Sequence, residues 1–125
     1  MKKSVIFALY INRSDEGNEV LIEIAKSRGE ETDVRKTALF WVAQLATKKV
    51  LETLEKITLE DDKVKIQEYT VFAISQFPEN ESIPALIRIA KTNPYKNVRK
   101  KAIFWLSQKD DPRVIEFLED ILLNR

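Results

Sequence analysis

The stretch VRKTALFWVAQLATKKVLETLEKI at residues 34–57 recurs 64 residues later as VRKKAIFWLSQKDDPRVIEFLEDI at residues 98–121, with no gap in the alignment. A second pair of segments matches at an offset of 65, where FALYINRSDEGNEVLIEIAKS (7–27) aligns with FAISQFPENESIPALIRIAKT (72–92). The two matches are staggered by about half of that distance. The sequence therefore predicts four units of about 32 residues, which duplication of a two-unit block explains most simply. We place these units at about 2–33, 34–63, 64–97 and 98–125, within one domain.

Each unit has the hydrophobic periodicity of two consecutive helices. In the second unit, apolar residues recur at spacings of three and four, and the same spacing resumes after a short break. Glycine and proline, at 2 and 4 residues, are too scarce for many β-strands joined by tight turns. The fold class is therefore predicted to be all-α. The apolar positions of the second unit are Val34, Ala38, Trp41, Val42, Leu45, Val50, Leu51, Leu54 and Ile57.

Polar residues mark the expected helix starts. We predict Asp33 and Asn97 to be N-caps, because each precedes a Val-Arg start. Asp111 followed by Pro112 predicts a third cap, since proline is favoured at the first position of a helix. The expected loops between units are SRGEETD (27–33), TLEDDK (58–63) and TNPYKN (92–97).

The composition excludes most catalytic and metal sites. The chain has no Cys and no His, so it contains neither a thiolate zinc site nor a nucleophile–histidine pair. The acidic runs at 60–62 and 110–111 lie in predicted loops, where acids usually serve solvation and capping. We therefore expect no enzymatic activity, no cofactor and no metal.

The charge is balanced along the chain. Its 21 basic and 20 acidic residues give a net charge of +1, and no unit has a strong excess of either sign. Lys96, Arg99, Lys100 and Lys101 cluster in the fourth unit. We interpret them as the solvated start of a helix, with a small phosphate or nucleic-acid patch as the alternative.

The repeats resemble HEAT repeats of the short bacterial type, also called PBS-lyase-like. In these repeats a V-R-x-x-A-x-x-A-L-G helix is followed by a D-P turn and a V-P-x-L helix. The resemblance implies a right-handed α-α superhelix, with the second helix of each repeat on the concave side, where partners bind. The residues that match are Val98, Arg99, Ala102, Trp105, Leu106, Asp111, Pro112, Val114 and Leu118, together with Ile83, Pro84 and Leu86.

The second helices are therefore the predicted partner-binding face. The 32-residue register aligns Glu23, Lys56, Arg88 and Asp120 in one column of mixed sign. Mixed charges favour a protein partner, whereas acidic groups repel a nucleic-acid backbone. A nucleic-acid-binding module is the alternative function, and an ordinary solvated face is the alternative interpretation of the column. The flanking residues assigned to the same face are Glu19, Glu55, Lys91, Glu116 and Glu119.

Three further sets of residues recur in register on the first helices. The tryptophans are predicted to pack in the core, and the phenylalanines are predicted to pack between units. The glutamines are predicted to fix the turn within each unit by bonding loop backbone. A ligand site is the alternative for the tryptophans. The three sets are Trp41 and Trp105; Phe7, Phe40, Phe72 and Phe104; and Gln44, Gln76 and Gln108.

Both ends of the chain are apolar. MKKSVIFALYI at 1–11 resembles a secretion signal, but its register with the third unit favours a helix of the first unit. The run Ile121, Leu122 and Leu123 ends the last helix. Because the terminal units of a repeat stack need polar outer faces, we expect either a piece of a longer solenoid or self-association through the ends.

Overall fold

The computed structural model describes residues 2–12 and 15–123, and this part of the chain forms eight α-helices and no strand. The prediction of an all-α fold is confirmed. The helices are α1 (Lys2–Asn12), α2 (Asp15–Lys26), α3 (Thr32–Ala43), α4 (Lys48–Glu60), α5 (Val64–Ser75), α6 (Glu79–Thr92), α7 (Lys96–Ser107) and α8 (Pro112–Leu122).

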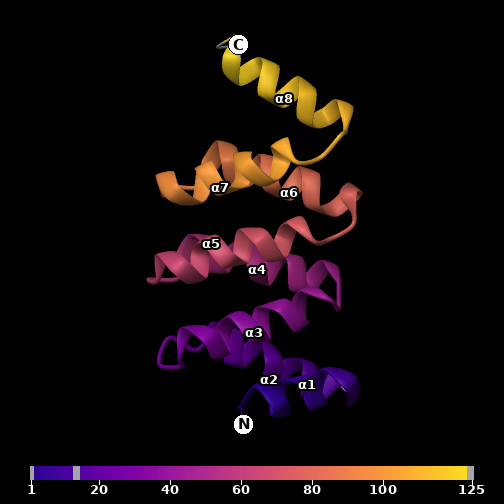
Figure 1. Cartoon of the computed structure of the whole chain (residues 1–125), viewed down its shortest axis with the longest axis vertical. Helices are drawn as coiled ribbons and strands as arrows, with labels where there is room; N and C mark the ends of the chain where they lie inside the picture. Colours follow the sequence, from indigo (N-terminus) through magenta and orange to yellow (C-terminus); the bar gives the residue numbers. More distant parts are fainter. Residues whose placement is uncertain (1, 13–14, 124–125) are drawn as a thin grey trace.

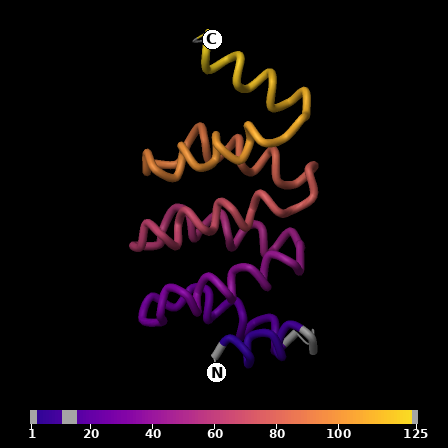
Figure 2. The backbone as a smooth tube through the Cα atoms, viewed as in Figure 1, coloured from indigo at the N-terminus to yellow at the C-terminus, as the bar shows by residue number. Residues whose placement is uncertain are grey.

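The helices are stacked in pairs along one long axis, and the two ends of the chain lie at opposite ends of the stack (Figure 1). We call α1, α3, α5 and α7 the first helices and α2, α4, α6 and α8 the second helices. Each first helix packs on the next first helix, and α2, α4 and α6 pack against the first helix of the following unit. The backbone trace climbs from unit to unit (Figure 2). Packing between successive units is the organisation of a solenoid.

One continuous apolar core runs through the stack. Leu54 of the second unit and Ile74 and Leu86 of the third are fully buried, as their helical spacing predicted. Leu39, which the predicted face of the second unit omitted, is fully buried as well. Each such side chain contributes about 1.5–3 kcal/mol on leaving water. On the first helices, small residues such as Ala38 are also fully buried, which lets neighbouring helices approach closely.

Two of the three predicted N-caps are wrong. The amide of Arg35 bonds the carbonyl of Glu31, so α3 is capped by Glu31 and Asp33 lies in its first turn. In the same way α7 is capped by Tyr95, and Asn97 is its second residue. The third prediction is confirmed, because the Asp111 carboxylate accepts the amide of Arg113 at 2.9 Å.

The loops between units are shorter than predicted. Residues 58–60 continue α4 as its last turn, and α3 and α7 begin at Thr32 and Lys96, within the predicted loops. Within the second unit, Ala46 has a φ of 51°, in the left-handed region, and turns the chain between α3 and α4. Among the described residues, no helix is both long enough and apolar enough to cross a membrane.

Candidate interaction surfaces

A buried ion pair lies at the edge of the stack where one unit passes into the next. The guanidinium of Arg35 donates to both carboxylate oxygens of Asp61, with Nη1 at 3.3 Å from Oδ1, and its Nε donates to the carbonyl of Ala25 at 3.0 Å. Arg35 is 0% exposed and Asp61 is 5% exposed. The prediction that the acids at 60–62 are exposed loop residues is therefore wrong for Asp61, although Glu60 and Asp62 are exposed.

The environment of Asp61 favours its charged form. Burial by itself raises the pKa of this carboxyl group, but hydrogen bonds from Arg35 and from the amide of Lys63 lower it, as do the charges of Arg35 and Arg28. The net result is a pKa below the usual value. The carboxylate is therefore ionised at neutral pH and stabilises the structure, rather than acting as a proton donor.

Neutral amides continue this polar network into the later units. Gln67 donates to the carbonyl of Asp61 at 2.6 Å, and Asn93 donates to the carbonyl of Thr58 at 3.1 Å. Arg99 donates to the carbonyl of Asn93 at 2.8 Å. This network was not predicted from the sequence. The repeat spacing could have revealed it, because polar residues recur every 32 positions at Arg35, Gln67 and Arg99, and again at Asp61 and Asn93.

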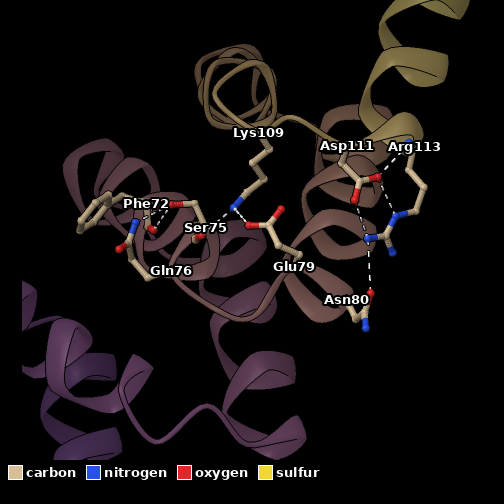
Figure 3. Close-up of polar contacts among 8 residues, drawn as sticks. All are labelled: Phe72, Ser75, Gln76, Glu79, Asn80, Lys109, Asp111 and Arg113. Atoms are coloured by element: carbon tan, nitrogen blue, oxygen red, sulfur yellow. Dashed lines mark hydrogen bonds and ion pairs between the residues drawn. The ribbon is translucent and has the colours of Figure 1, made fainter.

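A second polar network lies at the opposite edge, near the turn between α7 and α8 (Figure 3). Lys109 extends from the end of α7 to the carbonyl of Ser75 and the carboxylate of Glu79, at 3.0 Å from each acceptor. Arg113, at the start of α8, reaches the side chain of Asn80 at 3.4 Å. These bonds connect the fourth unit to the third and are structural contacts.

The three glutamine side chains do not bond the loop backbone, so this prediction is wrong. Gln44, Gln76 and Gln108 do end the first helices, as C-cap residues, but all three are exposed. The side chain of Gln44 donates to the carbonyl of Phe40 in its own helix, and that of Gln76 donates to the adjacent Ser75. The turns are therefore fixed by backbone bonds to the last carbonyls of the helix.

The predicted partner-binding residues all lie on second helices. Glu55 and Asp120 are half-buried and the other seven are exposed. The structure brings two of them together, because Arg88 of α6 donates to the carboxylate of Glu55 of α4 at 2.6 Å. Lys91 lies over the ring of Phe117 in α8, at 5.8 Å from its centroid. The seven exposed residues are Glu19, Glu23, Lys56, Arg88, Lys91, Glu116 and Glu119.

Two small depressions open on this face between neighbouring second helices. One, of about 120 Å³, lies between α4 and α6 and includes the Glu55–Arg88 pair. The other, of about 280 Å³, lies between α2 and α4, and its lining includes Lys26, Arg28 and Lys56. Both are smaller than the usual pocket for a small-molecule substrate. They are suited to receive single side chains of a partner.

In the folded chain, the layer of first helices and the layer of second helices differ in charge. Among the described side chains, basic residues dominate the first helices and acidic residues dominate the second helices. Each unit contributes to both layers, so the charge summed along the sequence hides this separation. The first helices have Lys3, Arg35, Lys36, Lys65, Lys96, Arg99, Lys100 and Lys101 against Asp33 and Glu68. The second helices have Lys26, Lys48, Lys49, Lys56, Arg88, Lys91 and Arg113 against Glu16, Glu19, Glu23, Glu52, Glu55, Glu60, Glu79, Glu81, Glu116, Glu119 and Asp120.

The tryptophans pack against the core but remain half-exposed. Trp41 contacts Phe7 of the preceding unit, with ring centroids 5.2 Å apart, and Trp105 contacts Phe72 at the same distance. The prediction that phenylalanines pack between units is confirmed for Phe7 and Phe72. Phe104 contacts the tryptophan of its own helix and is 50% exposed. The aromatic rings therefore also form part of the surface of the first helices.

The residues that the structure describes contain no cluster of three or more metal-ligating side chains.

The HEAT-repeat family model matches the chain over residues 18–103 and 51–125. Together with the paired helices, this match shows that the chain belongs to the HEAT-repeat family, as its repeats indicated. Comparison with curated proteins and with solved structures gave no significant match. HEAT repeats are generally scaffolds for protein interaction and are typically non-catalytic.

Proposed function

We propose that this chain is a non-catalytic scaffold that binds a protein partner along the face formed by its second helices. The observation that carries this proposal is that charged residues lie on this face in all four units: acidic in the first and fourth, basic in the third, and one of each sign in the second. A partner with complementary charges would be fixed in register and orientation by such a pattern. We assign the binding to Glu19, Glu23, Glu55, Lys56, Arg88, Lys91, Glu116, Glu119 and Asp120, on what we propose to be the concave side.

The depression between α2 and α4 is the most specific feature of this face. Arg28 is held beside it by donating to the carbonyl of Glu60 at 2.6 Å. Lys26 and Lys56 are exposed and line the same depression, together with the hydroxyl-bearing Thr53. Glu60 and Asp61 also line this hollow, but Asp61 is already paired with Arg35. The three cations therefore remain in excess and would recognise a carboxylate of the partner. The surrounding acidic residues oppose a nucleic-acid backbone, which is the alternative ligand.

The apolar surface of α8 supports a second kind of contact. Ile115, Ile121, Leu122 and Leu123 are exposed by 51%, 47%, 82% and 62%. We propose that this surface is covered by self-association or by a further repeat. Contiguous apolar surface of this kind commonly marks an interaction site.

The test is affinity capture from a lysate of the source cells, with the chain as bait and chemical cross-linking to record the contact. Lys56→Glu reverses one charge in the depression, and we expect it to reduce capture of a specific partner at least about tenfold. Lys48→Glu is the matched control, because it makes the same change at an exposed position in the first turn of the same helix.

A swap of the Glu55–Arg88 pair gives a second variant. Glu55→Arg with Arg88→Glu keeps an ion pair between α4 and α6 and keeps the net charge, but it reverses the polarity that a partner meets. We expect the swap to weaken capture without changing the melting temperature. Equal capture by Lys56→Glu, by the swap and by the wild-type chain would show that the partner does not bind this face.

A further inference from the structure

A basic and aromatic groove lies on the first helices, away from the face proposed above. It is a shallow depression of about 420 Å³ between α5 and α7. In Figure 1 the layer that contains α5 and α7 lies in front of α4 and α6. Three aromatic side chains and three lysines line the groove, with one carboxylate among them. Its lining residues are Tyr69, Phe72, Trp105, Lys36, Lys65, Lys101 and Glu68.

The aromatic side chains form one connected surface across the two helices. The ring centroids of Tyr69 and Phe72 are 5.4 Å apart, and those of Phe72 and Trp105 are 5.2 Å apart. All three rings are half-buried and line the groove, and Tyr69 and Trp105 also pack against the core. Rings held in this way offer a rigid apolar surface at a low cost in side-chain entropy.

The lysines around these rings have little compensating charge. Lys65 and Lys101 are exposed, and neither forms an ion pair with any residue that the structure describes. Lys36 lies over the ring of Tyr69, with its Nζ 5.7 Å from the centroid. Glu68 is the single acidic residue of the lining. The groove therefore combines an apolar floor with a net positive rim.

We propose that this groove binds a short acidic peptide segment in which one aromatic or aliphatic side chain is flanked by carboxylates. The apolar side chain would pack on Phe72 and Trp105, and the carboxylates would pair with Lys65 and Lys101. Charge pairs at the exposed rim of a binding site help to orient a bound segment and increase its association rate. This proposal uses the first helices and does not rest on the function proposed for the second helices.

The same features disfavour single-stranded nucleic acid. A sequence-independent strand needs a continuous basic path along its phosphates, with open ring faces on which bases stack. Here the carboxylate of Glu68 lies among the three lysines of the lining, so the basic path is not continuous. Phe104 also packs against Trp105 in a T-shaped arrangement, at an interplanar angle of 84°, and this contact takes up part of the ring surface.

The binding test uses fluorescence anisotropy with three labelled probes: the peptide DEFEDL, its neutral counterpart NQFQNL and a twelve-residue oligothymidylate. We expect the acidic peptide to bind the wild-type chain at least about tenfold more tightly than the neutral peptide, with an affinity that falls as salt is raised. The double variant Lys65→Glu/Lys101→Glu should lose this binding. Lys48→Glu, on the second helices, should retain it.

Two further measurements complete the test. Melting curves of the double variant should match the wild type, because both lysines are exposed. Sedimentation at several concentrations checks for a second copy of the chain, since α8 itself has acidic and exposed apolar residues. Equal affinity for the two peptides, tighter binding of the oligonucleotide, or a dimer that the double variant abolishes would each overturn the proposal.

Discussion

Arg35 and Asp61 form an ion pair that joins the start of α3 to the end of α4 from inside the protein. Arg35 is fully buried, and its third donor contact, to the carbonyl of Ala25 in α2, extends the link into the first unit. A buried pair of this kind depends on both partners, because either charge left alone would be desolvated without compensation. The interface between the first two units is therefore sensitive to single changes at these residues.

Asp61→Asn removes one charge of this pair and keeps an oxygen that can accept the amide of Lys63. We expect the free energy of unfolding to fall by about 3–5 kcal/mol, since Arg35 would remain buried without a counter-charge. Urea denaturation followed by circular dichroism measures the change. Asp62→Asn, at the exposed neighbour, is the control and should change stability little. Stability equal to that of Asp62→Asn would contradict the role given to the pair.

The same pair predicts a pH dependence. The pKa of Asp61 is lowered in the folded protein, so its contribution to stability is present above the ordinary carboxyl value of 3.8 and is lost as the pH falls through the lower folded value. The difference in unfolding free energy between the wild type and Asp61→Asn should therefore shrink below about pH 4. A difference that stays constant from pH 6 to about pH 2.5 would show that the charge of Asp61 is not the source of the effect.

Thr47 caps the N-terminus of α4. Its hydroxyl oxygen accepts the amide of Val50 at 3.1 Å, directly after the turn at Ala46. Thr47→Ala should lower the free energy of unfolding by about 0.5–2 kcal/mol, as for other cap deletions. Thr47→Ser keeps the oxygen and serves as the control. If both variants lose the same stability in urea denaturation, the hydroxyl is not the stabilising group.

Stability should differ between helices. Five residues of α4 are buried, whereas Val114 and Phe117 are the two buried residues of α8 within the described chain. A helix with few buried contacts opens locally at a lower free energy, so amide protons of α8 should exchange at least about tenfold faster than those of α4. Hydrogen exchange with mass spectrometry measures both rates after correction for intrinsic exchange. Equal protection of the two helices would indicate that all four units unfold together.

The sequence by itself predicted the paired helices and their register. Apolar side chains three and four residues apart face one direction in any helix, so this signal needs no knowledge of neighbouring units. The internal match of 34–57 with 98–121 then fixed the repeat length. The predicted starts of α3 and α7 were wrong, because Glu31 and Tyr95 cap these helices through backbone hydrogen bonds alone and so leave no side-chain signal in the sequence.

Only the tertiary structure decided which polar residues are buried and how the charges are distributed. Asp61 follows the same acidic pattern in the sequence as the exposed Asp62, and it becomes a buried partner only because Arg35, 26 residues earlier, packs beside it. Charge summed along each unit is near balance, since both helices of a unit enter the sum. Packing separates those helices into two layers, and the basic groove of Lys65 and Lys101 exists because residues 36 positions apart meet on one layer. Local periodicity determines the repeat, whereas contacts between units determine its surfaces.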